Sequence, residues 1–362
     1  MKELKRTYVN YREVPKRNQI EYKSDTLMLN DKGELLIDGG YARHDYFSFD
    51  ASLSRPKSRL KQWDFYQISN GKLMAQISFA NISLAGYISV VVVDLSTGEK
   101  LVDNMSLFIG GKKYPLPPYS DKDNTLSYKI KDAEFSFVRK DNKRILDVSM
   151  FKKKVPIIAH FDIDMPEGNE NITTILPFKN KPKKFFMTTK ENCMPTQGFV
   201  SYGDKKYEFS KEDTFTVLDW GRVNTPYKLV WYWGNGSTYL LDKDGNKHLF
   251  GFEITWGIGD EKNATETAIF YDGVLHKFGS VDVKHFVKNR YMEEWVFESE
   301  DNRFNLKMTP TLDHHSDLNL LLLRMNSHQV HGLWNGTVVL DDGTILEIKD
   351  MYAFCEYVEN RW

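Results

Sequence analysis

The sequence predicts an all-β protein made of two tandem antiparallel β-barrels, and a duplicated hairpin is the main observation behind this prediction. The stretch 135–137 (Phe-Ser-Phe) precedes 141–143 (Asp-Asn-Lys), and 295–297 (Trp-Val-Phe) precedes 301–303 (Asp-Asn-Arg). The offset is constant, because 295 − 135 and 301 − 141 are both 160. A β-sheet unit that occurs twice favours two stacked barrels, and such barrels commonly enclose an apolar space.

A second set of matches lies near the end of each half. Its offset is smaller, since 361 − 222 = 139. The difference, 160 − 139 = 21, indicates an insertion of 21 residues in the first unit, which we place in the Gly-, Asn-, Pro- and Lys-rich stretch 162–190. The matched pairs are Val200 with Val339, Glu208 with Glu347, Phe215 with Phe354 and Arg222 with Arg361.

The third observation is that strand and turn patterns alternate along the chain, whereas no long segment has a helical period. Residues 88–93 form a run of mainly β-branched residues that ends at Ser96-Thr97-Gly98. Its counterpart at 266–270 ends at Tyr271-Asp272-Gly273. An aromatic content of 14% also favours strands. Only residues 56–63 read as one or two helical turns.

We expect three parts in the chain. Residues 1–40 are polar and mixed in charge, and they read as an N-terminal extension. Residues 41–223 are expected to form the first barrel domain and residues 224–362 the second, because Asn224-Thr225-Pro226 interrupts the strand pattern after Arg222.

Composition excludes several classes of protein. The formal charge is −1, so neither nucleic acid nor an anionic membrane is indicated as a partner. No stretch is long and apolar enough to span a bilayer, and the charged N-terminus has no apolar run behind it. The two cysteines lie in different halves and predict no disulfide framework. A cytoplasmic protein is therefore expected, with its oligomeric state left open.

Histidine spacing argues against a metal centre. His314 and His315 are neighbours, and His328 and His331 are three apart, so on strands each pair points to opposite faces. No cysteine cluster accompanies them, and the sequence predicts neither a metal nor another cofactor.

Tryptophans form the clearest candidate binding surface. Alternate residues of a strand share a face, so Leu229, Trp231 and Trp233 are predicted to form one stripe. By the same rule Trp220 and Arg222 share a face, which permits a cation–π stack. Such residues form either a barrel core filled by tryptophan or the wall of a site for a hydrophobic ligand.

Three carboxylates are candidates for acid–base chemistry. Asp219 and Glu356 each lie a few residues before the arginine that ends a unit, and Glu266 lies in an otherwise apolar strand. Burial in an aromatic barrel raises a carboxyl pKa, as an acid that protonates a double bond or carbonyl requires. The alternative is a set of salt bridges, with Asp219 paired to Arg222 or Arg361 and Glu356 paired to the other arginine.

Several spaced motifs resemble the domain of unknown function 2804 family over about residues 30–362. That family is distantly similar to tandem lipocalin-like proteins such as carotenoid 1,2-hydratases and tocopherol cyclases, which protonate an alkene in a long isoprenoid chain. The resemblance implies two lipocalin-like barrels, but it transfers no catalytic residue. Glu266-Thr267 and His331 depart from the family pattern, a difference expected to affect ligand preference. The motifs are Trp63-Asp64-Phe65-Tyr66, Asp219-Trp220-Gly221-Arg222, Thr265 to Gly273, His328 to Gly332 and Glu356 to Trp362.

Together these observations predict a protein that binds a hydrophobic small molecule such as a lipid or isoprenoid. Asp219 or Glu266 would supply a proton for hydration, cyclisation or isomerisation, and Arg222 would orient a polar end of the ligand. A non-catalytic carrier and a carbohydrate-active or carbohydrate-binding β-sandwich remain as alternatives. The predicted ligand-contacting residues are Trp220, Arg222, Trp231, Trp233, Trp256, His331 and Glu356.

Overall fold

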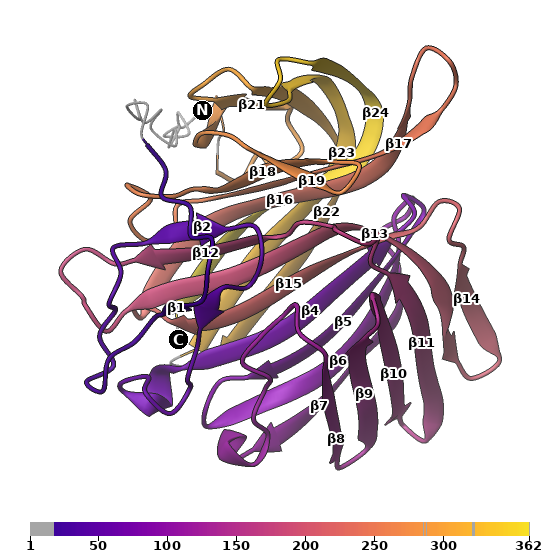
Figure 1. Cartoon of the computed structure of the whole chain (residues 1–362). Coiled ribbons are helices and arrows are strands. Elements are labelled where there is room, and N and C mark those ends of the chain that lie inside the picture. Colours follow the sequence, from indigo (N-terminus) through magenta and orange to yellow (C-terminus); the bar gives the residue numbers. More distant parts are fainter. Residues whose placement is uncertain (1–17, 285, 287, 321–322, 362) are drawn as a thin grey trace, which may run out of the picture.

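The computed structural model describes residues 18–284, 286, 288–320 and 323–361, and it confirms the all-β tandem-barrel prediction (Figure 1). The expected N-terminal extension lies outside the described residues over positions 1–17. Within the described part, helix is confined to two short 3-10 turns, η1 (Lys57–Arg59) and η2 (Gly111–Lys113). The first of these turns falls in the stretch where the sequence predicted a helical turn.

The first barrel-like sheet is a long antiparallel path with short strands added to it. Its path runs β7-β6-β5-β4-β15-β13-β11-β10-β9-β8, while β12 and β14 pair with β13 and β2 pairs with β12. The strands are β2 (Gly40–Ala42), β4 (Lys61–Ser69), β5 (Leu73–Asn81), β6 (Ala85–Asp94), β7 (Lys100–Ile109), β8 (Asn124–Ile130), β9 (Ala133–Lys140), β10 (Lys143–Lys152), β11 (Val155–Asp164), β12 (Ile172–Pro177), β13 (Phe185–Tyr202), β14 (Lys205–Phe209) and β15 (Phe215–Asn224). A separate parallel pair joins β1 (Thr26–Leu27) to β3 (Phe47–Ser48).

The second barrel-like sheet follows the order β19-β18-β17-β16-β24-β23-β22-β21-β20. In both sheets the first four long strands form a meander, and the last strand returns to pair with the first strand of that meander. The strands are β16 (Lys228–Leu241), β17 (Lys247–Trp256), β18 (Glu266–Tyr271), β19 (Val274–Lys277), β20 (Val281–Lys284), β21 (Trp295–Ser299), β22 (Phe304–Leu320), β23 (Leu323–Val339) and β24 (Ile345–Arg361).

The duplicated sequence elements occupy corresponding places in the two sheets. Asp141-Asn142 turns β9 into β10, and Asp301-Asn302 turns β21 into β22. Asn142 and Asn302 have φ values of 58° and 61°, a left-handed conformation that asparagine adopts more readily than most residues. The predicted insertion at 162–190 contains β12, a strand off the main path of the first sheet.

Strand alternation separates the two faces of each sheet. On β4, Tyr66 and Ile68 are buried in the core of the first barrel, whereas Trp63 and Phe65 face the second barrel. On β16, Tyr232 belongs to the core of the second barrel, and the neighbouring tryptophans on either side of it face the first barrel. Each barrel therefore has its own packed core, and a third layer of side chains lies between the barrels.

The change from one sheet to the other supports the domain division that we propose at residue 223. β15 ends at Asn224 and β16 begins at Lys228. Contacts nevertheless cross this division, because Gln19 Nε2 donates to Phe278 O (2.9 Å) and Ile20 N donates to Asn263 O (2.8 Å). The described part of the N-terminal segment thus binds to the second sheet.

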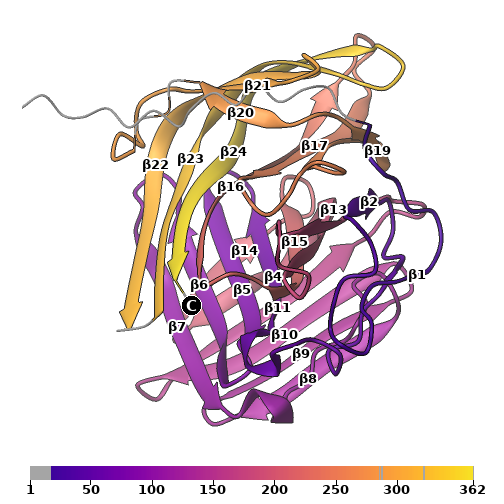
Figure 2. The same cartoon turned by 90° about the vertical axis from the view of Figure 1, so that its left-hand side faces the viewer.

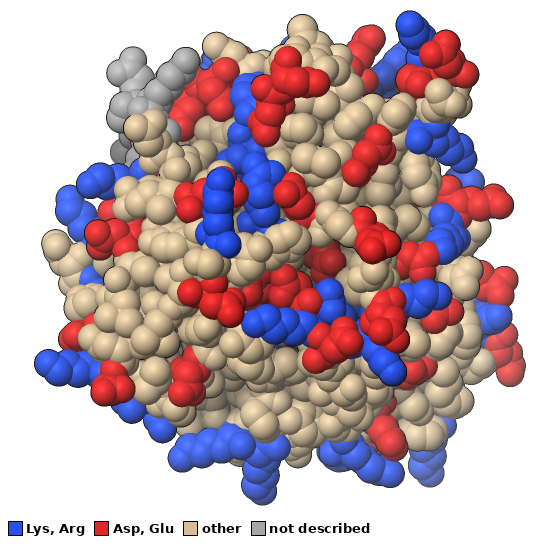
Figure 3. Space-filling model, viewed as in Figure 1, with Lys and Arg blue, Asp and Glu red and all other residues tan. Residues whose placement is uncertain are grey.

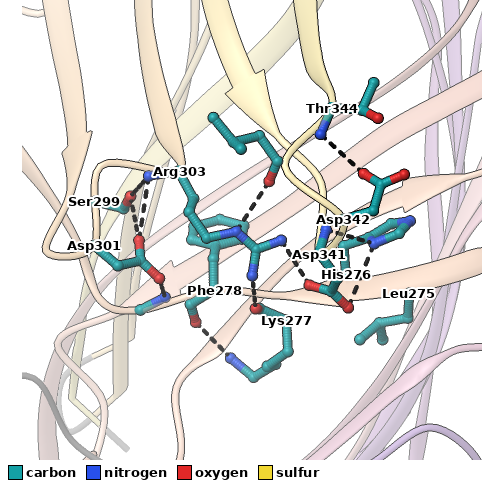
Figure 4. A network of polar contacts seen from close by, with 12 residues as sticks. Leu275, His276, Lys277, Phe278, Ser299, Asp301, Arg303, Asp341, Asp342 and Thr344 are labelled. Atoms are coloured by element: carbon teal, nitrogen blue, oxygen red, sulfur yellow. Dashed lines mark hydrogen bonds and ion pairs between the residues drawn. The ribbon is translucent and has the colours of Figure 1, made fainter.

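A polar network around Arg303 secures one end of the second barrel (Figure 4). Its guanidinium pairs with Asp341 (Nη2–Oδ1 2.6 Å), and it donates to the carbonyls of Lys277 (2.6 Å) and Val339 (3.0 Å). Arg303 therefore ties the start of β22 to β19 and to the β23–β24 turn. The arginine of the duplicated Asp-Asn-Arg motif thus has a structural role.

The outer surface carries charges of both signs. Lysine and arginine are interspersed with aspartate and glutamate over the face seen in Figure 3, so no extended basic surface covers that face. Within the described residues, no helix has the length and apolar character needed to cross a bilayer.

Candidate functional site

A cavity of about 330 Å³ lies between the two barrels. The first barrel contributes residues of β4 to β7, β13 and β15, and the second contributes residues of β16, β17 and β22 to β24. The strands β22 to β24 run alongside β6 and β7 in Figure 2. This volume is at the lower end of the range typical of small-molecule sites. Its apolar lining includes Trp63, Phe65, Phe186, Val223, Leu229, Trp231, Trp233, Ile258 and Val358.

Antiparallel register sets the cavity wall of the second barrel. Glu356 on β24 lies between Trp233 on β16 and Gln329 on β23. Two residues further along the strand, Val358 lies between Trp231 and Ser327. Because side chains alternate along each strand, both rows face the cavity. The predicted common face of Leu229, Trp231 and Trp233 is confirmed, and it is directed toward the other barrel.

Glu356 is a carboxyl at the cavity wall with a raised pKa. Its side chain lines the cavity, and its Oε1 accepts a hydrogen bond from Trp231 Nε1 (3.3 Å). Burial raises the pKa of Glu356 to about 7, with nearby Lys190 opposing the rise and Asp219 adding to it. A large fraction of this carboxyl is therefore protonated at neutral pH, when an ordinary glutamate is ionised.

Lys190 and Asp219 form an ion pair at the cavity wall. Lys190 on β13 is 3% exposed, and its Nζ lies 3.0 Å from Asp219 Oδ1 and 4.2 Å from the ring centre of Trp233. Burial opposes the charge of Lys190, but Asp219, Glu266 and Glu253 outweigh it and hold the lysine pKa above its usual range. The predicted salt bridge of Asp219 thus exists, but its partner is Lys190 instead of Arg222 or Arg361.

Two further carboxylates lie behind the cavity wall. Glu253 is fully buried and accepts hydrogen bonds from Trp233 Nε1 (3.0 Å) and Asn235 Nδ2 (2.8 Å). Burial raises the pKa of Glu253 to about 8, with Lys190 opposing and Glu266 adding to the rise. Glu266 is also fully buried, and its Oε1 accepts the hydroxyls of Thr174 (3.0 Å) and Thr188. Glu266 does not line the cavity, so it is poorly placed for contact with a ligand there.

Two other predicted site residues lie inside the first barrel. The Arg222 guanidinium stacks over Trp220 at 3.9 Å, as the shared face predicted, and it pairs with Asp64 (3.0 Å). Arg222 is fully buried and also donates to the carbonyls of Trp63 and Pro117. These contacts use the guanidinium within the fold, and neither Trp220 nor Arg222 lines the cavity.

Trp256 and His331 also lie away from the cavity. Trp256 stacks on Tyr232 at 4.6 Å in the core of the second barrel. His331 lines a smaller, more polar space of about 130 Å³. Burial lowers the pKa of His331 to about 3, with His314 adding to the effect, so this ring is neutral.

Sequence reasoning missed Lys190, Trp63 and Phe65 as site residues. Trp63 and Phe65 belong to one of the motifs that resemble the family, and their spacing by two indicates a shared face of the strand. Lys190 lies at the end of the stretch assigned to an insertion and carried no signal of its own. Gln329 was also missed, and its Oε1 accepts a hydrogen bond from Gln76 Nε2 (2.9 Å) that joins the two barrels.

Gly221 makes room for the wall residue Trp63, which leads to a testable prediction. A Cβ at position 221 would lie 2.1 Å from the Trp63 ring, well inside van der Waals contact. We expect Gly221→Ala to push Trp63 into the cavity, to lower the free energy of unfolding by about 1–3 kcal/mol and to weaken apolar probe binding. Urea unfolding and fluorescence titration check both effects. In the double variant Gly221→Ala/Trp63→Phe, the smaller ring should relieve the clash. If the change in the free energy of unfolding of the double variant equalled the sum of the changes in the two single variants, this explanation would be contradicted.

Among the described residues, no group of three or more His, Cys, Asp and Glu side chains is arranged to hold a metal ion.

No curated protein matches the sequence. Among the solved structures that match, two cover most of this chain. A candidate AttH protein from Nitrosomonas europaea has 12% identity and a TM-score of 0.45, over 85% of this chain and 95% of its own. Kievitone hydratase from Nectria haematococca has 10% identity and a TM-score of 0.48, over 96% of this chain and 98% of its own.

The family comparison agrees with the motifs found in the sequence. The matching model is described as a domain of unknown function, and the match extends over residues 19–362, which include both barrel-like sheets. The chain therefore belongs to the domain of unknown function 2804 (DUF2804) family.

Proposed function

We propose that the protein binds a hydrophobic small molecule in the cavity between its barrels and that Glu356 transfers a proton to this ligand. One observation carries the proposal: a carboxyl whose pKa burial raises to about 7 lines a cavity walled by Trp231, Trp233 and Phe65. An acid of this kind is protonated often enough at neutral pH to act, and its ionised form can take the proton back.

The reaction class that fits this site is acid-assisted hydration or isomerisation of an alkene. Protonated Glu356 gives its proton to one alkene carbon, and the π electrons form the new C–H bond. The neighbouring carbon becomes cationic and is stabilised by the faces of aromatic rings such as Trp231. In hydration, water forms a C–O bond and returns one proton to the Glu356 carboxylate. In isomerisation, the Glu356 carboxylate instead takes a proton from a carbon next to the cationic one, and the electrons of that C–H bond form the double bond at its new position.

Asp219 has a supporting role in this proposal. Its carboxylate is partly exposed and is held beside the Lys190 ammonium, so it can accept a hydrogen bond from the attacking water. Glu266 is assigned no contact with the ligand. Instead it helps to balance the buried charge of Lys190.

A non-catalytic carrier is the second candidate, since the aromatic lining by itself supports retention of an apolar ligand. Both roles are proposed for the cytoplasm. Cys193 and Cys355 are free and buried, which supports a reducing compartment.

Filling the cavity tests the binding part of the proposal. Ala80 on β5 lines the cavity, so Ala80→Trp should occupy the ligand space and reduce the affinity for the fluorescent probe N-phenyl-1-naphthylamine at least tenfold. Thr125→Trp, at an exposed position on β8, is the matched control and should bind like the wild type. If the wild type and both variants bound the probe equally well, the probe would bind at a place other than this cavity. Native mass spectrometry of protein exposed to a lipid extract then identifies what the wild type retains.

A further inference from the structure

Asn360 is a buried polar side chain whose hydrogen-bonding capacity is unused by the described part of the chain. It is 2% exposed and lines the cavity near the end of β24. Neither its Nδ2 nor its Oδ1 has a hydrogen-bond partner among the described residues. Most buried amides in folded proteins are paired, because burying one without partners costs free energy. An amide left entirely unpaired at a cavity wall therefore needs an explanation.

The neighbours of Asn360 on the same face do not supply a partner. Its strand register places Leu229 of β16 on one side and Met325 of β23 on the other, and both also line the cavity. Leucine has no hydrogen-bonding group, and the methionine sulfur is only a weak acceptor. Among the described neighbours on this face none pairs with the amide, and the residue itself lines the cavity.

The position of Asn360 relative to Glu356 sets the shape of the ligand. Both residues are on β24 and face the cavity, four positions apart. At about 3.3 Å per residue, this spacing corresponds to about 13 Å along the strand. Val358 lies between them on β24, flanked by Trp231 on one side and Ser327 on the other, so most of the intervening wall is apolar. The two polar positions are therefore separated by a mainly hydrophobic stretch.

We propose that Asn360 binds a neutral polar end of the ligand that both donates and accepts hydrogen bonds, a hydroxyl being the simplest such group. This inference rests on the proposed function, because it concerns the same cavity. The amide offers an NH₂ donor and a carbonyl acceptor, and a hydroxyl complements both. The ligand is thus an elongated amphipathic molecule, with its polar end at Asn360 and its protonated carbon near Glu356. Asn360 is a specificity-determining residue in this arrangement.

The test uses ten-carbon probes that differ at one end. Decan-1-ol both donates and accepts hydrogen bonds, and decan-2-one only accepts them. 1-Chlorodecane forms no hydrogen bond of comparable strength. Each is titrated against protein loaded with N-phenyl-1-naphthylamine, and displacement gives its affinity. For the wild type we expect decan-1-ol to bind about tenfold more tightly than 1-chlorodecane, with decan-2-one between them.

Replacement of Asn360 by leucine is expected to lower the ligand selectivity and to raise the stability of the ligand-free protein. Asn360→Leu should reduce the preference for decan-1-ol over 1-chlorodecane to within about twofold. It should also raise the melting temperature of the ligand-free protein by about 2–4 °C, because the unpaired amide is gone. A residue with a purely structural role would show the reverse, a lower melting temperature and unchanged selectivity. Asn360→Ala, which also removes both the donor and the acceptor, provides the same selectivity comparison if the leucine variant does not fold.

The matched control is Glu347→Gln, at an exposed position on the same strand and outside the cavity, which should keep the wild-type preference. Unchanged selectivity in both Asn360 variants, with probe binding intact, overturns the assignment of Asn360 and leaves the proposed function standing. Failure of the wild type to retain N-phenyl-1-naphthylamine overturns both.

Discussion

Lys190→Met is expected to lower the free energy of unfolding by about 3–5 kcal/mol at pH 8. Lys190 is 3% exposed, and its ammonium faces Asp219, Glu266 and Glu253. Methionine has a similar length and packs against Trp233, so little volume is lost. The loss arises because the variant leaves buried carboxylates without their counter-charge, and an uncompensated buried charge is strongly destabilising.

The same variant should recover stability as the pH falls. Burial raises the pKa of Glu253 to about 8 and that of Glu356 to about 7, both from 4.5. Between 4.5 and these values the folded state holds protons that the unfolded chain has released, so stability falls as pH rises through this window. In the variant, Glu253 and Glu356 lose the ammonium that opposes their protonation, so acidification neutralises both of them more readily. The deficit relative to the wild type should therefore be largest at pH 8 and clearly smaller at pH 5.

Urea unfolding of both proteins at pH 5 and pH 8 measures this difference. Lys206→Met is the control, because Lys206 pairs with Glu208 at the surface and both side chains are more than half exposed. An exposed pair contributes at most about 1 kcal/mol. A Lys190→Met deficit as small as that of Lys206→Met, or one that grows on acidification, would contradict the role assigned to the ammonium.

The sequence predicted the local features of the fold well, because these depend on neighbouring residues. The Asp-Asn turns at 141–142 and 301–302 require a left-handed conformation that asparagine supports, and both hairpins form where the duplication placed them. The shared face of Trp231 and Trp233 follows from strand alternation alone.

Strand alternation did not predict whether a given face borders the cavity between the barrels or the core of one barrel. Trp231 and Trp256 are both aromatic residues on strands, yet one lines the cavity between the barrels and the other stacks on Tyr232 inside the second barrel. That difference depends on how the two sheets pack, a long-range property. Glu266 and Glu356 illustrate the same limit, because only Glu356 is on a face that reaches the cavity.

One prediction was wrong for a local reason. Asp219 and Arg222 are three positions apart on β15, so their side chains point to opposite faces of the strand. Arg222 therefore pairs with Asp64 inside the first barrel, and Asp219 pairs with Lys190 outside it. The strand periodicity used for the tryptophans already argued against a pairing between Asp219 and Arg222.

Glu356→Gln is expected to reduce turnover at least about 100-fold while leaving ligand affinity nearly unchanged. Glutamine keeps the size of the side chain and an oxygen that can accept the Trp231 hydrogen bond, but it has no acidic proton to give. The compound retained by the wild type is the substrate for this assay. Hydration adds the mass of one water, and isomerisation in D₂O introduces deuterium, so mass spectrometry detects either reaction.

The pH dependence provides a second readout of the same residue. Because the reaction requires the protonated form and burial raises the pKa of Glu356 to about 7, wild-type kcat/KM should fall as pH rises through 7, approaching tenfold per unit. Glu347→Gln is the matched control, since Glu347 is exposed on the same strand β24, and it should retain the wild-type profile. A flat profile between pH 6 and 8, or turnover in Glu356→Gln within threefold of the wild type, would assign the proton transfer to another group. Ligand retention without any turnover in the wild type would favour the carrier, because the same aromatic wall would then bind a molecule that Glu356 never protonates.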